Sequence, residues 1–163
     1  MNIRYIEETD NLIDISHIYE ESWKCAYKGM LPASFLESIE NGRWVNSLKQ
    51  EGRYSLVIEE DGKLVGTASY CLSRQETLPS YGELVAIYLL PEYIGKGYGK
   101  PLYEAVLQGL QSLGVDGIYL WVLEDNKGAI EFYEKLGYSF NGKYLEDEIG
   151  GKQVRELMMC REW

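Results

Sequence analysis

Three glycines at alternate positions are the residues of this sequence best placed to bind a ligand. Gly95, Gly97 and Gly99 follow an apolar run, residues 84–90, which is typical of a strand buried on both faces. Glycine adopts backbone angles that other residues resist, so several N–H groups in such a loop can converge on one anion. A helix with Pro101 in its first turn is predicted to follow. A strand, a glycine loop and a helix N-terminus in this order predict a site for a phosphate group.

Two common phosphate-binding motifs do not fit this loop. A P-loop ending at Lys100 requires a glycine where Ile94 stands and a Ser or Thr where Pro101 stands. A dinucleotide-binding fingerprint requires its third glycine at position 100 or 102, where the sequence has Lys100 and Leu102. The spacing therefore argues against both classes of nucleotide site.

A second stretch with a regular pattern of residue types lies downstream, at residues 126–138. Asn126 is a typical N-cap for a helix predicted over residues 126–135. Tyr133 lies on the same stripe of that helix as Phe132. The pattern leaves two interpretations open. Either Asn126 only caps the helix and Tyr133 only packs in the core, or both residues face a ligand.

Together the two stretches resemble the two signatures of the GNAT superfamily of N-acetyltransferases. The sequence Ile94-Gly95-Lys96-Gly97-Tyr98-Gly99 is similar to the acyl-CoA signature Q/R-x-x-G-x-G/A, with Ile94 in place of Gln or Arg. Residues 126–138 are similar to N-x-x-A-x-x-F-Y-x-x-x-G-[FY]. The resemblance is strongest over residues 83–138 and looser over the first fifty. It implies acetyl-CoA as the acyl donor, with a pyrophosphate held mainly by backbone N–H groups that do not depend on the side chain at position 94.

The resemblance also implies roles for particular residues along the coenzyme. Asn126 would contact the coenzyme, Tyr133 would protonate the departing thiolate, and a backbone N–H near Leu89 would stabilise the oxyanion. No metal or organic cofactor is needed beyond acetyl-CoA. The residues implied for the two parts of the coenzyme are Ile87, Tyr88 and Leu89 along the pantetheine arm, and Gly95, Lys96, Gly97, Tyr98, Gly99 and Lys100 at the pyrophosphate.

Acetyl transfer to an amine requires the neutral amine, and Glu83 is the candidate base for producing it. An amine of pKa ~10.4 is mostly protonated at pH 7, which costs about 4–5 kcal/mol unless a base or a desolvating site intervenes. Glu83 begins the central strand, and its spacing from the glycine loop resembles that of the catalytic glutamate in the histone-acetylating branch of the family. The alternatives are that Glu83 is a strand-end carboxylate in water, and that a water chain or another group acts as the base.

The acceptor is expected between the first two helices and the central strands, where the candidate residues are aromatic. Trp23, Tyr27 and Tyr70 could pack on an amine or its alkyl chain, although aromatic residues at helical spacing are more often core. The predicted activity is direct transfer from acetyl-CoA to a primary amine of a small molecule or protein in a ternary complex. The alternative is an acyl-CoA-binding regulatory module without turnover. The presence of Glu83 and Tyr133 favours the enzyme.

The composition narrows the range of partners. A net charge of −10 argues against nucleic acid, and it fits either a cationic acceptor or an ordinary acidic surface that favours solubility. Three widely spaced cysteines and a single histidine, His17, indicate neither a disulfide framework nor a metal site. The sequence shows no signal peptide and no apolar run of transmembrane length, so a cytoplasmic protein without a membrane partner is expected.

A single α/β domain with a mixed central sheet and flanking helices is predicted over residues 1–163. The resemblance identifies it as the acyl-CoA N-acyltransferase (GNAT) fold, whose terminal strands often pair subunits, so a homodimer is one expectation. The expected strands are residues 1–6, 53–59, 64–72, 84–90, 118–123, 138–140 and 153–160. The expected helices are residues 12–27, 33–50 with an interruption near Gly42, the stretch from the glycine loop to about residue 114, and 126–135.

Overall fold

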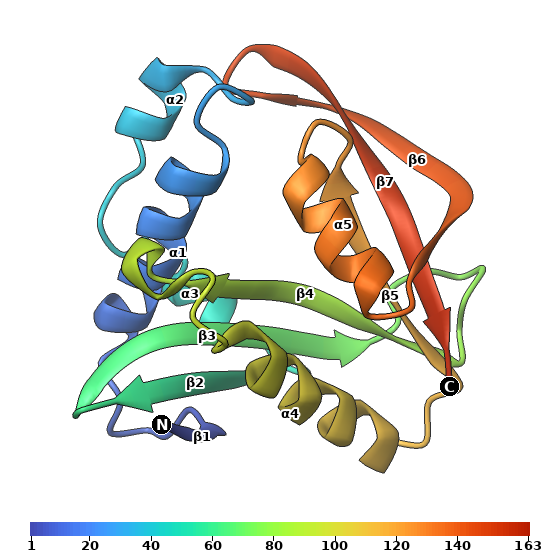
Figure 1. The fold of residues 1–163 in the computed structure, drawn as a ribbon, viewed down its shortest axis with the longest axis horizontal. Helices are drawn as coiled ribbons and strands as arrows, with labels where there is room; N and C mark the ends of the chain where they lie inside the picture. Colours follow the sequence, from blue (N-terminus) through green and yellow to red (C-terminus); the bar gives the residue numbers. More distant parts are fainter.

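The fold is built on one seven-stranded sheet, seen in a computed structural model that describes residues 1–163 (Figure 1). The strands lie in the order β1-β2-β3-β4-β5-β7-β6, and β4 and β5 form its single parallel pair. This arrangement confirms the predicted mixed α/β fold. The strands are β1 (Asn2–Tyr5), β2 (Tyr54–Glu60), β3 (Lys63–Leu72), β4 (Tyr81–Leu89), β5 (Gly117–Leu123), β6 (Ser139–Ile149) and β7 (Lys152–Glu162).

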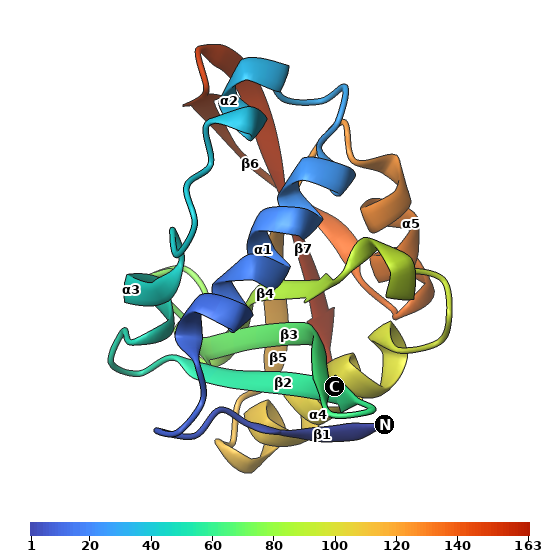
Figure 2. The ribbon, with the colours of Figure 1, turned by 90° about the vertical axis from the view of Figure 1, so that its left-hand side faces the viewer.

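Helices cover both faces of the sheet. On one face α1 packs against β3 and β4, with α2 and α3 beside it, and on the other face α4 packs against β2, β3 and β4 (Figures 1 and 2). No helix is long and apolar enough to cross a membrane. The helices are α1 (Leu12–Ala26), α2 (Ala33–Glu37), α3 (Val45–Leu48), the 3₁₀ turn η1 (Pro91–Tyr93), α4 (Gly99–Ser112) and α5 (Lys127–Lys135).

The helix predicted over residues 33–50 is in fact two short helices, α2 and α3, separated by a turn. The turn contains Gly42, near which the sequence predicts an interruption. Gly42 has a φ of +81°, and its N–H donates to the buried carboxylate of Glu20 in α1 at 2.9 Å. The N–H of Trp44 donates to the Ser16 hydroxyl at 3.0 Å. Polar side chains of α1 thus replace the helical hydrogen bonds that the turn gives up.

The parallel pairing of β4 with β5 is short. It joins residues 81–83 to residues 117–119 and ends at the pair Glu83 and Tyr119. Beyond this pair the two strands diverge, whereas β3 stays paired with β4 as far as Leu89 (Figure 1). The outer half of β4 therefore has one edge without a partner strand.

A β-bulge in β4 changes which side chains face which helices. Tyr70 of β3 lies opposite Leu84 and Ser69 lies opposite Ala86, so Val85 has no partner. Leu84 packs in the core under α4, and Ile87 packs on the same side, whereas Ala86 packs against α1. Glu83 alternates with Leu84 and so points to the α1 face.

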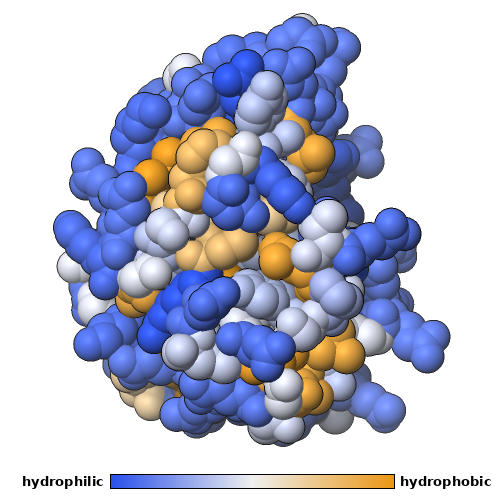
Figure 3. Space-filling view, turned by 90° about the vertical axis from the view of Figure 1, so that its right-hand side faces the viewer, coloured by the Kyte–Doolittle hydropathy of each residue, from blue (hydrophilic) through white to orange (hydrophobic).

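The hairpin of β6 and β7 extends past the body of the sheet, and β6 is an exposed edge strand. Phe140, Tyr144 and Leu145 of β6 are each about half exposed. Figure 3, which faces the β6 side of the molecule, shows hydrophobic patches within a mostly hydrophilic surface. A homodimer through the terminal strands stays a prediction.

The close approach of α4 to the sheet gives a prediction about stability. A Cβ on Gly109 of α4 would lie 2.0 Å from the hydroxyl of the fully buried Tyr70. Gly109→Ala should therefore lower the free energy of unfolding by about 1–3 kcal/mol through overpacking, although alanine is normally the better helix former. Gly128→Ala in α5 is the matched control, because a Cβ there meets nothing within 4 Å. Urea unfolding of both variants tests this, and a more stable Gly109→Ala would contradict the packing.

Candidate active site

Two of the three glycines in the loop have the backbone conformation that the sequence predicts, whereas Gly99 has no positive φ and is the first residue of α4. Gly95 and Gly97 have φ values of +76° and +89°, in the left-handed region that L side chains avoid. A Cβ at either position would meet nothing within 4 Å. These glycines are therefore required by backbone angle and not by crowding within the protein, and the space above them is open.

Six consecutive backbone N–H groups in this loop, those of residues 95–100, donate to no acceptor in the protein. The last two belong to the first turn of α4, which has no side-chain cap and no acidic residue. Unsatisfied N–H groups and the positive end of the helix dipole together attract an anion. The loop thus offers the free donors that a phosphate site requires.

The two lysines of the loop are turned toward other groups. The Lys100 ammonium lies 3.8 Å from the Glu104 carboxylate, one turn along α4, and the Lys96 ammonium lies 5.8 Å from the centre of the Tyr93 ring. Both side chains are at the surface. The backbone, and not these cations, provides the fixed anion-binding groups.

The outer half of β4 offers further free N–H groups. The N–H of Leu90 donates to the Val65 carbonyl at 2.9 Å, and hydrogen-bonded pairs alternate along an antiparallel ladder. The peptide groups of Ile87 and Leu89 therefore point away from β3, toward the side that β5 has left. The Leu89 carbonyl there accepts the Ser22 hydroxyl at 2.6 Å. An extended ligand could pair with this edge as an added strand would.

Tyrosines from three elements meet near this edge. Trp23 of α1 donates its indole N–H to the Tyr88 hydroxyl at 3.2 Å, and its ring contacts that of Tyr27 at a centroid distance of 4.9 Å. Burial raises the pKa of Tyr27 to about 12, and burial with the neighbouring Tyr27 hydroxyl raises the pKa of Tyr88. Burial also raises the pKa of Tyr133 in α5. All three phenols thus keep their protons at neutral pH and can act as donors.

The two open interpretations of the second motif are partly compatible. The Asn126 side-chain oxygen accepts the Ala129 N–H at 3.2 Å, so it does cap α5, while its amide nitrogen has no partner in the protein. Tyr133 packs edge-on against Tyr138 with ring centres 5.7 Å apart, and is only partly buried. Both residues have structural contacts and both keep a polar group available to a ligand.

Glu83 is not the solvated carboxylate of the alternative interpretation, because it is only 4% exposed. Arg74 donates Nη2 to its Oε1 at 2.7 Å and Nε to its Oε2 at 2.9 Å. Tyr119 of β5 donates its hydroxyl to Oε2 at 2.8 Å. Sequence reasoning missed both partners, since Arg74 lies in a polar loop and Tyr119 in an apolar strand without any local motif.

The three aromatic residues predicted for the acceptor do not come together. Trp23 and Tyr27 are neighbours on α1, on one face of the sheet. Tyr70 is a correction: it lies in the core on the α4 face, 1% exposed, with its hydroxyl bonded to that of Tyr5. Tyr70 alternates along β3 with Ser69, which bonds to Tyr19 of α1, and so shares the α4 face with Ala68. The spacing along the sequence does not reveal which face of the strand meets α4.

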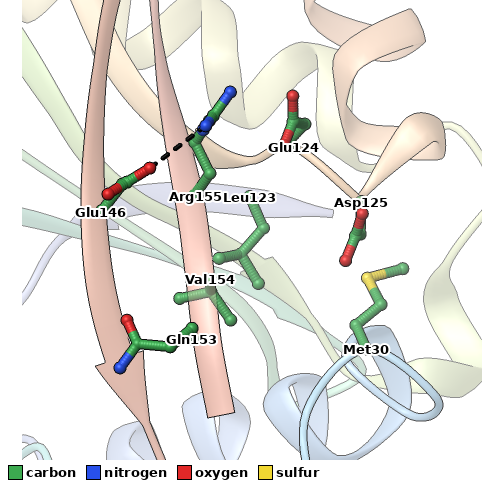
Figure 4. A pocket seen from close by; sticks show the side chains of 8 residues that line it. All are labelled: Met30, Leu123, Glu124, Asp125, Glu146, Gln153, Val154 and Arg155. Atoms are coloured by element: carbon green, nitrogen blue, oxygen red, sulfur yellow. Dashed lines mark hydrogen bonds and ion pairs between the residues drawn. The ribbon is translucent and has the colours of Figure 1, made fainter.

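A cavity of about 450 Å³ lies beyond the end of β5, between the turn after α1 and the hairpin of β6 and β7 (Figure 4). Leu123 lies four residues beyond Tyr119, on the part of β5 that has diverged from β4. The cavity therefore lies on the side of the divergence where β5 ends. Its lining residues are Met30, Leu123, Glu124, Asp125, Glu146, Gln153, Val154 and Arg155.

The cavity has an excess of negative charge. Arg155 pairs with Glu146 at 3.1 Å, as the dashed line in Figure 4 shows, and its guanidinium lies 4.3 Å from the Tyr144 ring centre. The carboxylates of Glu124 and Asp125 have no ion-pair partner. No group of three or more His, Cys, Asp or Glu side chains in the chain is arranged to hold a metal ion. The unpaired carboxylates give the cavity a negative charge that attracts cations.

Comparison with known proteins places this arrangement in a family. Residues 14–138 match the model of the acetyltransferase (GNAT) family. The chain is 30% identical over 152 residues to the uncharacterized N-acetyltransferase YuaI of Bacillus subtilis (strain 168), covering 91% of this chain and 86% of that protein. It is 32% identical over 134 residues to the spermine/spermidine N(1)-acetyltransferase of the same strain, covering 74% of this chain and 80% of that protein.

The fold also matches solved structures. The crystal structure of the PaiA N-acetyltransferase from Thermoplasma acidophilum in complex with coenzyme A superposes over 100% of both chains with a TM-score of 0.79 at 21% identity. The structure of the ribosomal-protein-alanine N-acetyltransferase from Brucella melitensis superposes over the same share with a TM-score of 0.74 at 22% identity. With its two signature stretches matched to the family model and its fold shared by these structures, the chain belongs to the acetyltransferase (GNAT) family.

Proposed function

We propose that this protein transfers an acetyl group from acetyl-CoA directly to an amine, with both substrates bound at once. The observation that carries the proposal is the row of six unsatisfied N–H groups at residues 95–100, next to the free edge of β4. Together they form an extended donor surface that fits a pyrophosphate followed by an amide-containing chain. The coenzyme A bound by the PaiA protein, whose fold this chain shares, supports the same ligand here.

The coenzyme would bind along β4 and across the start of α4. The pyrophosphate would lie on Gly95, Lys96, Gly97, Tyr98, Gly99 and Lys100, and the pantetheine amides would pair with the peptide groups of Ile87 and Leu89, next to Tyr88. Asn126 at the start of α5 would donate its free amide N–H to the coenzyme. One of the two N–H groups of Ile87 and Leu89 would stay unpaired by the pantetheine arm. That N–H group would stabilise the oxyanion.

The acceptor would enter from the opposite direction, through the cavity beyond β5. Two unpaired carboxylates, Glu124 and Asp125, favour a cationic amine, and Trp23 and Tyr27 border the approach on α1. The spermine/spermidine acetyltransferase relative acts on amines of this charge, which supports the same class of acceptor. Donor and acceptor would meet at the divergence of β4 and β5, consistent with direct transfer.

Proton transfer would use Glu83 and Tyr133. A strand advances about 3.3 Å per residue, so Glu83 lies about 13 Å along β4 from Ile87 and would take the amine proton through water. The neutral amine then forms the C–N bond, and the C–S bond breaks. Tyr133, which its raised pKa keeps protonated, would donate its hydroxyl proton to the departing thiolate. The second proton that the nitrogen loses on becoming an amide would return through water to the Tyr133 oxygen.

Acetyl-CoA should stabilise the native protein strongly, and Gly97→Val should abolish that effect. At 100 times its Kd a ligand adds about 2.7 kcal/mol to the free energy of unfolding. The valine would strain a φ of +89° and place a side chain over the anion-binding loop. Gly52→Val is the matched control, with a φ of +78° and equally open surroundings in a remote turn. Thermal melts decide the matter, and an unchanged ligand shift in Gly97→Val would exclude the loop as the site.

The acceptor should be a cation recognised by the cavity. Neutralising both unpaired acids, with Glu124→Gln and Asp125→Asn together, should raise the acceptor KM about 3–30-fold and leave the acetyl-CoA KM unchanged. In the native protein the acceptor KM should rise with salt, because the Debye length falls from about 10 Å at 0.1 M to 3 Å at 1 M. Steady-state kinetics with Glu51→Gln as a surface control test this. A neutral or anionic best acceptor would refute it.

Glu83→Gln and Tyr133→Phe should differ in their dependence on pH. Without a base, activity should be lowest near neutral pH and recover at high pH, where the amine deprotonates unaided. Tyr133→Phe should lower kcat by about 10–10³ with little change in acetyl-CoA binding, the range of general acid catalysis. Circular dichroism must first show both variants folded. Full kcat in Tyr133→Phe, or no activity of Glu83→Gln at any pH, would remove the assigned role of that residue.

A further inference from the structure

The carboxylate of Glu83 is held by one fixed partner and one movable partner. Tyr119, whose hydroxyl donates to Oε2 at 2.8 Å, is fully buried in β5. The Arg74 side chain, which contacts both oxygens, is 51% exposed, against 5% for the side chain of Glu83. The guanidinium is thus the one partner of Glu83 that can withdraw into water without disturbing the core.

The Arg74 side chain can move while its loop stays in place. The backbone N–H of Arg74 donates to the Tyr119 hydroxyl at 3.0 Å, so the main chain is attached to a buried residue. On either side, the Ser73 hydroxyl accepts the Gln75 N–H at 3.1 Å, which closes the turn independently of the guanidinium. Rotation of side-chain bonds is enough to release the ion pair.

The present contacts prevent Glu83 from acting as a base. Each carboxylate oxygen accepts about two hydrogen bonds, and Oε2 already accepts one from Arg74 and one from Tyr119. Oε1 accepts one from Arg74, which leaves a single position for a water. The two hydrogen bonds from Arg74 thus occupy positions on both oxygens of the carboxylate. Release of Arg74 frees both positions at once.

We propose that Arg74 is a gate on Glu83 and thereby a specificity-determining residue for the acceptor. A cationic acceptor that reaches the divergence of β4 and β5 repels the guanidinium beside Glu83 and replaces its charge, whereas a neutral or anionic molecule leaves the gate closed. The ammonium proton then passes through water to Glu83, giving a neutral amine and a protonated carboxyl group, while Arg74 is solvated. The inference rests on the proposed function, because it takes Glu83 as the proton acceptor.

Arg74→Ala is the direct test. Because no guanidinium has to be displaced, the acceptor KM should fall about two- to tenfold, while the acetyl-CoA KM stays unchanged. Arg4→Ala is the matched control, since Arg4 forms a bidentate pair with Asp10, with both contacts at 2.8 Å, remote from the cleft. An unchanged or increased acceptor KM in Arg74→Ala would overturn the gate.

Added guanidinium chloride distinguishes an Arg74 that blocks Glu83 from an Arg74 that holds Glu83 in position for catalysis. At millimolar concentration, against matched sodium chloride, it should inhibit Arg74→Ala competitively with the acceptor and leave the native enzyme unaffected. If Arg74 instead holds Glu83 in a productive position, Arg74→Ala should lose kcat and guanidinium should restore it. Rescue in place of inhibition would therefore refute the proposal.

A binding measurement distinguishes failure of the gate from failure of the proposed function. Guanidinium should raise the melting temperature of Arg74→Ala without acceptor or coenzyme, and this shift should disappear in Arg74→Ala/Glu83→Gln. Absence of the shift overturns the gate whatever the activity. A shift together with no turnover on any amine overturns the proposed function, and with it the catalytic role of the gate.

Discussion

The early end of the hydrogen bonding between β4 and β5 is the constraint on which the rest of the structure depends. Three residue pairs join the strands, and after Glu83 and Tyr119 the outer part of β4 keeps its ladder only with β3. Unpaired peptide groups are normally costly inside a sheet. Here they face the one place that both α1 and α5 border, so the fold keeps a row of donors ready for a ligand instead of satisfying them internally.

Under the proposed function, divergence of the strands would also separate the two substrates in space. The anion-binding loop lies at the start of α4, on the face of the sheet that carries the large core. The acidic cavity lies beyond β5, where Leu123 belongs to the small core with α2. The helix N-terminus would therefore attract the polyanionic donor that we propose, and the carboxylates would attract the cationic acceptor. Neither ligand would have to pass through the position of the other.

The sequence predicted what depends on local pattern. Positive φ at Gly95 and Gly97, the cap at Asn126 and the interruption at Gly42 follow from residue type and spacing, and the structure has each of them. Features that depend on long-range register were missed. Tyr70 lies on the face of β3 that meets α4, the ion pair of Glu83 uses a loop residue without a motif, and the cavity is assembled from segments more than a hundred residues apart. Periodicity specifies the face of an element, but only pairing between strands specifies what that face meets.

The proposed binding of the donor by main-chain amides has a consequence for how this protein can change over evolutionary time. Any residue supplies an N–H, so the side chains at positions 94, 96, 98 and 100 are free to drift as long as the two left-handed glycines persist. Ile94, which stands where the signature has Gln or Arg, is a substitution of this kind. The acidic cavity does not tolerate substitution in this way, because its charge resides wholly in side chains. A single substitution there would alter which amine the cavity attracts. Mutational pressure on such a chain would therefore diversify the acceptor while the acyl donor stays the same.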